Sequence, residues 1–319
     1  MPDIPSIHDR GCPRVTPEAI MRLPTIFPGV RGEIRQDEPM AQHTSWRVGG
    51  TAGYYFKPQD REDLSLFLRV LPRETPLLWV GHGSNLLIRD GGFPGAVVCC
   101  HGRLSRLEKV AGNSLYIEAG VSCAKVARFS IRAGLRGAEF LAGIPGTIGG
   151  ALAMNAGAFG GEIWNIVSSV ELIDRDGQVH SRNATHFEPG YRAVDLPVGL
   201  WFLSATLGLA TGNAEYGRGR IRSLLVERAD RQPVRAASAG SVFRNPAGDY
   251  AARLIDKAGL KGLRQGDAEV SCQHANFIVN CGHASASDIE ALIGQVQTRV
   301  KEQFGVLLEP EVRIVGRRS

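Results

Sequence analysis

The sequence lacks any long apolar segment. No run within its 319 residues approaches the roughly 18 consecutive apolar residues of a membrane span, and residues 1–20 lack the apolar centre of a signal peptide. Apolar residues nevertheless make up 43% of the chain and charged residues 22%, which is ordinary for a globular protein. We therefore expect a soluble cytoplasmic protein without a membrane partner, and the length favours two or three packed units.

Cysteine pairs of the CxxC type are also missing. The six cysteines, without a secretory signal, predict reduced thiols and no disulfide framework. Two Cys-x-His pairs, Cys272 with His274 and Cys281 with His283, could each share one face of a strand, as metal ligands sometimes do. They lack the two-residue gap usual in zinc knuckles, and residues 275–280 between them are typical of a core strand. We predict no metal site.

Three common signatures of catalysis or nucleotide binding are absent. There is no GxGxxG, no glycine loop followed by GKS or GKT, and no GxSxG. These absences disfavour a Rossmann nucleotide site, a P-loop kinase and a Ser-His-Asp hydrolase.

Positive charge is in slight excess, with a formal net charge of +5. The densest basic stretch, residues 216–235, has only one aromatic residue, Tyr216, which gives little support to nucleic-acid binding. Two interpretations remain open: a solvated helix face, or binding of a diphosphate or carboxylate by one or two of the arginines. The arginines are Arg218, Arg220, Arg222, Arg228, Arg231 and Arg235.

Between residues 46 and 210, short apolar runs alternate with glycine-rich turns, which is typical of strands. Asp176-Gly177 stands between two such runs and predicts a hairpin turn. Residues 121–137 predict one helix, with a valine or serine at its start and a glycine at its end. The sequence therefore predicts a sheet-rich segment with at least one crossover helix.

The pattern changes near residue 213. Residues 249–262 predict a helix, residues 275–281 a strand, and residues 284–305 an amphipathic helix that a serine can cap and Gly305 can end. The apolar residues of the last helix follow helical spacing and form a core stripe; they are Ile289, Leu292, Ile293, Val296, Val300 and Phe304.

Two glycine-rich segments, residues 80–87 and 143–157, suit the close approach of a backbone to an anion. Missing side chains let amide groups reach phosphate oxygens, and the second segment runs into a predicted helix, whose N-terminus adds a positive dipole. Each segment alone is equally typical of a structural turn. Together they are compatible with the diphosphate of a dinucleotide.

Two further motifs carry polar groups with more than one interpretation. Ser241 follows a glycine in AGSVFRNP, and its local pattern is typical of a turn serine. Glu309 and Glu311 are two residues apart in LEPEVR, so an extended backbone would place both carboxylates on one face. Such a pair could transfer protons, but the spacing favours an exposed edge.

Taken in order, the motifs resemble the UDP-N-acetylenolpyruvoylglucosamine reductase family, which makes UDP-N-acetylmuramate for peptidoglycan. The resemblance runs from His43 to Gly316 and rests on HTSWRVGG, VGHGSNLLI, FLAGIPGTIGGALAMNAGAFGGEI, Tyr191-Arg192, AGSVFRNP, AEVSCQHANFIVN and LEPEVRIVG. It implies an α+β fold: an FAD-binding domain of the vanillyl-alcohol-oxidase (PCMH) type with two subdomains, then a smaller C-terminal α/β substrate domain. We place an N-terminal extension at residues 1–24 and these domains at 25–212 and 213–319, with the last strand free to pack against the FAD domain.

The resemblance also implies roles for individual residues. The family's proton donor falls on Ser241, and the two groups that polarise the substrate fall on Arg192 and Glu311. Hydride transfer to the enolpyruvyl group pushes negative charge toward the carbon beside the carboxylate, which Arg192 can stabilise in a bidentate contact. Glu311 needs its proton to donate, so its pKa should be raised by burial or by a like charge.

By the same resemblance the cofactor is non-covalent FAD, reduced by NADPH, and we expect the protein to be a monomer. The implied FAD contacts are Gly81, His82, Gly83, Ser84, Asn85, Leu86, Gly143, Ile144, Pro145, Gly146, Thr147, Gly149, Gly150, Asn155 and Gly157. Weaker substrate candidates are Tyr191, Arg231, Asn245 and His274. Arg231 stands where the family has lysine, and the short interval from Tyr191 to Ser241 indicates the second type of the family, without a tyrosine-bearing substrate loop.

Two alternatives remain at this point. Another flavin oxidoreductase of the same fold would have its flavin reduced by its substrate instead of by NADPH. A non-catalytic flavin or nucleotide module would keep the glycine loops but would not need Ser241, Arg192 and Glu311, so their joint presence argues against it.

Overall fold

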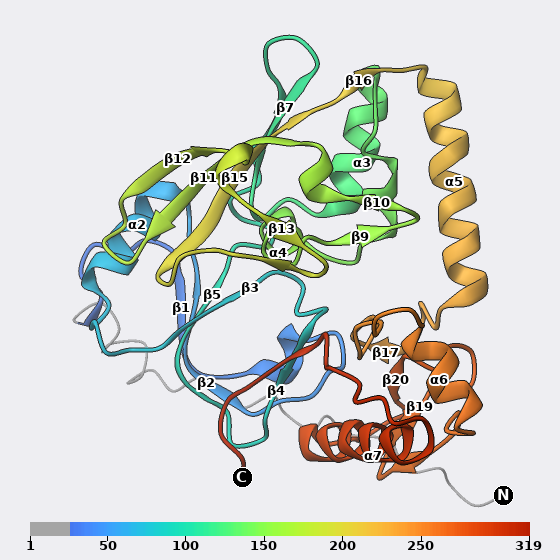
Figure 1. Ribbon diagram of the computed structural model, residues 1–319. Helices are drawn as coiled ribbons and strands as arrows, with labels where there is room; N and C mark the ends of the chain where they lie inside the picture. The colour runs from blue at the N-terminus through green and yellow to red at the C-terminus, as the bar shows by residue number, and fades with distance from the viewer. Residues whose placement is uncertain (1–25) are drawn as a thin grey trace, which may run out of the picture.

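The computed structural model of the protein describes residues 26–319, so the extension predicted at residues 1–24 lies outside the described part. Within it, strands gather into two larger sheets and one small C-terminal sheet, with helices packed against them (Figure 1). The α+β class predicted from the sequence is confirmed. No helix of these described residues is long and apolar enough to cross a membrane.

The first sheet has the strand order β1-β2-β5-β3. β1 pairs antiparallel with β2, whereas β5 lies parallel to both β2 and β3. Buried side chains of α2, including Leu64 and Phe67, join the apolar cluster on one face of this sheet. The elements are β1 (Glu33–Pro39), the 3-10 turn η1 (Met40–His43), β2 (Thr51–Lys57), α2 (Arg61–Val70), β3 (Leu77–Val80) and β5 (Phe93–Cys99).

The second sheet is antiparallel throughout, in the order β12-β11-β15-β7-β6. The turn between β11 and β12 contains Gly177 at a φ of +71°, which confirms the predicted hairpin at Asp176-Gly177. The strands are β6 (Leu107–Lys109), β7 (Ser114–Glu118), β11 (Val167–Asp174), β12 (Val179–Asn183) and β15 (Leu200–Gly208).

Short helices and hairpins surround the second sheet. The helix predicted within residues 121–137 is α3, which begins after Ser122 and is followed by Gly134 in a left-handed conformation. The helices are α3 (Cys123–Arg132), η2 (Glu139–Gly143), α4 (Ile148–Ala153), η3 (Ile163–Asn165) and η4 (Ala184–His186). The two-stranded pairs are β8 (Leu135–Arg136) with β16 (Ala210–Thr211), β9 (Gly157–Ala158) with β10 (Gly161–Glu162), and β13 (Pro189–Gly190) with β14 (Ala193–Val194).

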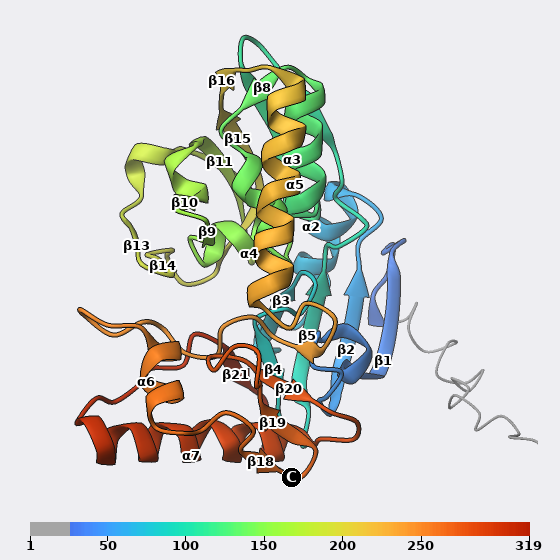
Figure 2. The ribbon, with the colours of Figure 1, turned by 90° about the vertical axis from the view of Figure 1, so that its right-hand side faces the viewer.

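The long helix α5 (Ala214–Arg231) stands beside α3 and leads into the C-terminal part of the chain (Figure 2). There a small antiparallel sheet, β17-β20-β19-β18, packs with α6 and α7. The elements are β17 (Ala237–Ser238), α6 (Ala251–Lys257), β18 (Arg264–Gln265), β19 (Ala268–Val270), β20 (Ile278–Asn280) and α7 (Ala286–Phe304). The strand expected over residues 275–281 is therefore shorter, because residues 271–277 form the turn that joins β19 to β20.

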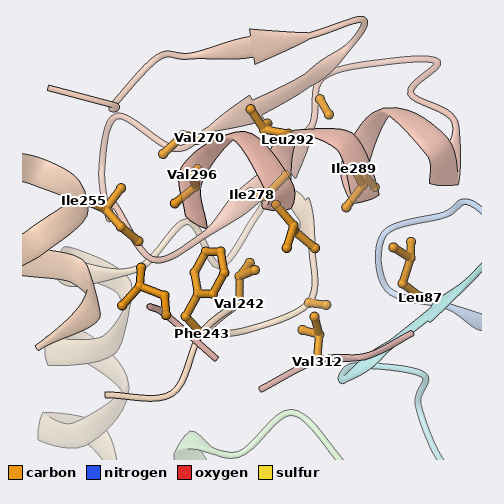
Figure 3. Packing of buried hydrophobic residues seen from close by; sticks show 14 of the residues in the cluster. Leu87, Val242, Phe243, Ile255, Val270, Ile278, Ile289, Leu292, Val296 and Val312 are labelled. Atoms are coloured by element: carbon orange, nitrogen blue, oxygen red, sulfur yellow. The ribbon is translucent and has the colours of Figure 1, made fainter. Parts of the chain in front are cut away.

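The core of this C-terminal part is built on α7, as its sequence predicts. Ile289, Leu292 and Val296 of α7 lie in one buried cluster with Val242, Phe243, Val270 and Ile278 (Figure 3). Ser285 caps the helix in a capping box with Asp288, and Gly305 ends it at a φ of +71°.

The last strand, β21 (Arg313–Val315), leaves the C-terminal part and pairs in parallel with β4 (Leu86–Ile88), with Arg313 opposite Leu86. Leu87 of β4 in turn joins the core cluster beneath α7 (Figure 3). This pairing places the segment before β21, which contains Glu311, beside the first glycine-rich segment.

Candidate active site

The first glycine-rich segment connects the end of β3 to the start of β4. Gly83 has a φ of +62°, and a side chain there would place Cβ 2.1 Å from the carbonyl oxygen of His43, so only glycine fits. The amides of His82, Gly83 and Ser84 donate to no backbone carbonyl within residues 26–319. These free donors suit an anion such as a diphosphate.

The second glycine-rich segment lies against the first. A Cβ on Gly81 would lie 2.4 Å from Oγ1 of Thr147, the residue that precedes α4. The segment is anchored from behind, because the amides of Ile148 and Gly149 donate to the carbonyls of Val121 and Ala119, each at 2.9 Å. The structure therefore brings together the cofactor residues predicted on the two segments.

Other predicted cofactor residues fall into three groups by exposure. Pro145 and Gly150 are exposed, whereas Gly143 and Leu86 are buried. Gly143 packs so closely on the ring of Phe159 that a Cβ would lie 2.4 Å from it. Gly146 and Ile144 are partly buried between these extremes, with Gly146 near Ser84 of the first segment.

His82 stacks edge to face on His101, with ring centroids 4.0 Å apart. Burial, and then the neighbouring His101, lower the pKa of His82. Burial likewise lowers the pKa of His101, with a smaller effect from Lys57. Both rings are therefore neutral near pH 7, because a lowered pKa lies below the usual value of about 6.5.

The end of the second segment supports the hairpin that carries Arg192. The buried Asn155 side chain donates to Glu162 Oε2 at 3.0 Å and to the Gly190 carbonyl at 2.9 Å. The Gly157 carbonyl accepts from Arg192 Nη2 at 3.2 Å. Asn155 and Gly157, predicted as FAD contacts, thus contact Arg192 or its hairpin.

Tyr191 and Arg192 are the two central residues of the tight turn between β13 and β14. Arg192 has a φ of +56°, a conformation that favours glycine or asparagine at this position of a turn. The Arg192 guanidinium carbon lies 5.1 Å from the centre of the Tyr191 ring, and its Nε is 3.2 Å from Glu311 Oε1. A strained residue held by several contacts is typical of a functional site.

Glu311 is the carboxylate of this group. Burial raises its pKa, while the nearby Arg192 and Arg244 guanidinium groups act in the opposite direction. The direction agrees with the expectation that this carboxyl group should hold its proton more tightly than usual. Asn85 Nδ2 donates to the Glu311 carbonyl at 3.1 Å, so this predicted cofactor residue also fixes the backbone of the glutamate.

Glu309 and Glu311 differ in exposure. Glu309 is exposed, whereas the Glu311 side chain keeps only 16% of its accessible surface, so the exposed edge that the spacing favours does not hold for Glu311. The Val242 carbonyl accepts from both the Glu311 and Val312 amides, at 2.8 and 3.4 Å. Two residues opposite one partner form a bulge, which interrupts the regular pairing at Glu311.

Ser241 lies next to this bulge, after Gly240 at a φ of +48° and directly before Val242. The Val242 amide donates to the Asn276 carbonyl, and the Asn276 side chain both accepts from the Phe243 amide and donates to the Phe243 carbonyl. Asn276 is buried and therefore holds the serine segment firmly. A buried polar residue within a strand-like pattern was the available sequence signal for this contact.

Arg244 belongs to the AGSVFRNP motif, but the sequence predicts no role for it. Its Nη2 donates to the Arg192 carbonyl at 3.2 Å, and its amide donates to the Glu309 carbonyl at 2.9 Å. Its Nε is buried without a hydrogen-bond partner among the described residues. The guanidinium therefore lies between the two segments that contribute Arg192 and Glu311.

The four predicted substrate residues do not all join this group. Asn245 contacts Tyr191, because its amide lies 3.5 Å from the tyrosine hydroxyl oxygen. His274 lies in the turn between β19 and β20, where Nδ1 accepts from the Asn276 amide at 3.2 Å and burial lowers the pKa of the ring. Arg231 ends α5 with an exposed side chain, paired with Glu227 at 2.9 Å.

The two Cys-x-His pairs lie in turns and not on strands, contrary to the geometry considered for them. Cys272 and Cys281 instead both contact the Glu269 carboxylate, at 3.7 and 3.8 Å. Among residues 26–319 no group of three or more His, Cys, Asp or Glu side chains has a geometry that could hold a metal ion.

One open groove lies away from this group. It has a volume of about 680 Å³ and lies between η2, the β9–β10 hairpin and α5, with Phe140, Phe159 and Tyr216 in its lining. It contains none of the predicted catalytic residues. We therefore locate the site at the glycine-rich segments and the Arg192 hairpin, where the chemistry of the side chains converges.

Two family models match the chain in comparison with known proteins. Residues 52–182 match the family model described as FAD binding domain, and residues 232–315 match that of UDP-N-acetylenolpyruvoylglucosamine reductase, C-terminal domain. Proteins named UDP-N-acetylenolpyruvoylglucosamine reductase from Alkalilimnicola ehrlichii and Nitrosococcus oceani are 54% and 55% identical to the chain. The alignments cover 89% and 90% of this chain and 95% and 96% of those proteins.

A solved structure shows the same arrangement over nearly its whole length. The crystal structure of UDP-N-acetylenolpyruvylglucosamine reductase from Thermus caldophilus matches with a TM-score of 0.76 and 35% identity, covering 89% of this chain and 98% of that chain. The FAD binding domain match and this structure confirm the fold class that the resemblance implies. The chain therefore belongs to the UDP-N-acetylenolpyruvoylglucosamine reductase family.

Proposed function

We propose that Ser241, Arg192 and Glu311 carry the catalysis of this enzyme. It is an FAD-dependent oxidoreductase that reduces UDP-N-acetylglucosamine enolpyruvate to UDP-N-acetylmuramate with NADPH as hydride donor, in peptidoglycan precursor synthesis. The observation that carries the proposal is the 3.2 Å contact of Arg192 with Glu311 beside the backbone segment of Ser241. Three distant parts of the chain converge there, although Arg192 occupies an unfavourable turn position.

The residues of the two glycine-rich segments fit FAD. The amides of His82, Gly83 and Ser84, which donate to no backbone carbonyl within residues 26–319, can donate to the diphosphate, and Thr147 lies against the adjacent Gly81. Bound FAD would accept a hydride from NADPH and pass it to the terminal enolpyruvyl carbon. The protein's own contribution is to orient the substrate, stabilise the developing charge and deliver a proton.

Arg192 is suited to the carboxylate of the enolpyruvyl group. Its planar guanidinium can bind a carboxylate through two hydrogen bonds, and it stays charged at any pH of interest. Gly157 and the Tyr191 ring limit its freedom, so the charge is positioned before the substrate arrives. Preorganised charge of this kind stabilises the enolate-like charge that hydride addition creates.

Glu311 and Ser241 complete the proton transfer. Glu311 with a raised pKa can keep its proton and share it with the developing enolate oxygen. Ser241, on the neighbouring segment, then donates its proton to the carbon beside the carboxylate. The backbone segments of the two residues are joined by a hydrogen bond from the Glu311 amide to the carbonyl of Val242, the residue after Ser241, at 2.8 Å.

Several finer assignments belong to the same proposal. Tyr191, Asn245, Arg231 and His274 would bind other parts of the substrate; the Tyr191–Asn245 contact supports the first two. Division into residues 25–212 and 213–319 is supported by α5, which begins at Ala214, although β21 returns to β4. We also place the enzyme in the cytoplasm as a monomer without nucleic-acid or membrane partners; light scattering after size-exclusion chromatography tests its oligomeric state.

The reaction is tested on the purified, flavin-loaded protein. NADPH oxidation should depend on UDP-N-acetylglucosamine enolpyruvate, whereas oxidation indifferent to that substrate would contradict the reaction. The alternative flavin oxidoreductase would instead show flavin reduction by its substrate without NADPH. Family membership favours the first outcome.

The proton-donor role is tested with Ser241→Ala. Flavin reduction by NADPH should stay within about twofold of wild type, while reoxidation by the enolpyruvyl substrate should slow by about 10² to 10⁴. Ser238→Ala, three residues earlier in β17, is the matched control. Equal slowing of both half-reactions by Ser241→Ala would show that the serine does not act as the donor.

A further inference from the structure

Arg244 connects all three parts of the site. Its amide donates to the Glu309 carbonyl at 2.9 Å, which fixes the serine segment alongside the segment before β21. Its side chain extends to the β13–β14 hairpin, where Nη2 donates to the Arg192 carbonyl at 3.2 Å. The residue therefore spans the distance between the C-terminal part and the hairpin that presents Arg192.

The environment of Arg244 is not explained by stability. Its Nε is buried and has no hydrogen-bond partner among the described residues. A buried donor without a partner destabilises the folded protein, so such a group requires another explanation. Its Nη2 donates to the carbonyl of Arg192, whose φ of +56° is unfavourable for a residue other than glycine or asparagine in this turn.

Charge supplies the explanation. Glu311 faces two guanidinium groups, Arg192 from the hairpin and Arg244 from the serine segment, while the neutral Asn85, just before β4, contacts the Glu311 backbone. Glu311 is neutral while it holds its proton, and Arg244 then adds a second positive charge beside Arg192. When Glu311 loses its proton, Arg244 keeps the group at one net positive charge, so in both states the group attracts an anionic ligand.

We propose that Arg244 is a positioning residue that holds the Arg192 turn and keeps the group positively charged in both protonation states of Glu311, so that Arg192 stays available to the substrate carboxylate. This inference rests on the proposed function. It assigns Arg244 an indirect role, through Arg192 and Glu311, and requires no contact between Arg244 and the reacting atoms.

The test compares Arg244→Gln with Arg244→Lys in the flavin-loaded enzyme. Gln removes the charge, so KM for the enolpyruvyl substrate should rise by about tenfold or more, while flavin reduction by NADPH stays within about twofold. In the pH–rate profile of the substrate half-reaction, the alkaline limb is the range in which the rate falls as the pH rises. This limb should move to higher pH, because Glu311 loses one of the two cations that lower its pKa. Lys keeps the charge, so its KM and its limb should stay close to wild type. Arg299→Gln, exposed on α7, is the control for loss of one surface arginine.

Three outcomes would overturn the proposal: a wild-type KM and limb in Arg244→Gln, equal rises of KM in the Gln and Lys variants, or a limb that moves to lower pH. Flavin content and thermal midpoint establish that each variant is folded. If the Gln variant does not fold, a tenfold rise of KM in Arg244→Lys would still contradict the role of charge. Failure of the proposed function is recognised separately, because the wild-type enzyme itself would then not turn over the enolpyruvyl substrate.

Discussion

We define the catalytic corner as Arg192, Ser241, Arg244 and Glu311. In helix α7, unlike in this corner, local sequence preferences and tertiary contacts favour the same conformation. In α7 the local preferences agree: Ser285 and Asp288 form a capping box, the first-turn amides of Ala286 and Ser287 donate to Asp90, and Gly305 ends the helix in a left-handed conformation. Its apolar stripe is buried against the core. Each of these features stabilises the same structure, which is the mark of an element that defines the fold.

In the catalytic corner, tertiary contacts hold residues in conformations or environments that are locally unfavourable. Arg192 has a positive φ in a tight turn, Arg244 buries a nitrogen that has no hydrogen-bond partner within residues 26–319, and the carboxyl group of Glu311 is buried enough to raise its pKa. Neighbouring segments hold these residues in place at a cost in stability. The comparison indicates that substitutions in α7 should change the stability of the protein without changing its chemistry. Substitutions in the corner should change the chemistry more than the stability.

The largest expected effect in the corner comes from Glu311→Gln. Gln keeps the shape but cannot give up a proton as an acid, so reoxidation of the flavin by the enolpyruvyl substrate should slow by about 10² to 10⁴, with NADPH reduction near wild type. In the wild-type enzyme, activity that needs the protonated carboxyl is present below its raised pKa and is lost as the pH rises through it. The Gln variant should lose that alkaline limb, which stopped-flow absorbance of the flavin against pH measures.

Glu309→Gln is the matched control for this prediction, because Glu309 is two residues away and exposed. It should leave both half-reactions and the limb unchanged. Stability gives a second readout: burial of the neutral Glu311 carboxyl stabilises the fold at low pH, and that contribution is lost as the pH rises through the raised pKa. The stability of Glu311→Gln relative to wild type should therefore increase with pH, and a constant difference would argue against a raised pKa.

In α7 the largest expected effect comes from Leu292→Ala. The side chain is fully buried, so its truncation should lower the free energy of unfolding by about 2 to 5 kcal/mol, as measured by denaturant titration of the flavin-loaded protein. Turnover per folded molecule should stay near wild type. Leu307→Ala is the control, because Leu307 is 59% exposed and its loss should cost no more than about 0.5 kcal/mol. A large loss of turnover in folded Leu292→Ala would remove the contrast between the two regions.

The same contrast explains what the sequence could predict. The spacing of apolar residues, the serine cap and the closing glycine predicted α7 because each of these signals acts within one helix. The hairpin at Asp176-Gly177 and the helix α3 were predictable for the same reason. Such elements are specified by residues close together in the chain.

The corner could not be predicted in this way. Gly81 meets Thr147, and β21 pairs with β4, through contacts between residues far apart in the sequence. The local pattern around Ser241 indicates only a turn, so its role comes from the family resemblance. Arg244 looks like any arginine near a turn, because the groups that give it a function belong to two other segments. Residue spacing likewise does not reveal that Glu309 is exposed while the Glu311 side chain is largely buried.

A smaller effect is expected from the cap of α7. Ser285→Ala removes the acceptor for the Asp288 amide and should lower the free energy of unfolding by about 1 kcal/mol. The loss should be at the lower end of the range for helix caps, because Asp90 still accepts from two other amides of the first turn. Ser223→Ala, exposed within α5, is the control. An unchanged denaturation midpoint in Ser285→Ala would show that Asp90 alone is sufficient to cap the helix.

The smallest expected effect is the difference in stability between the Arg192→Gly and Arg192→Ala variants. Both variants remove the guanidinium, so both should lose the substrate half-reaction to the same extent. They differ only in Cβ, which is unfavourable at a φ of +56°, whereas glycine accepts this conformation at a cost in unfolded-state entropy. The Gly variant should therefore be more stable than the Ala variant by about 0.5 to 1 kcal/mol in denaturant unfolding. Equal stabilities would mean that the turn relaxes once the side chain is gone, and that the strain in the corner comes from the contacts of Arg192 and not from its backbone.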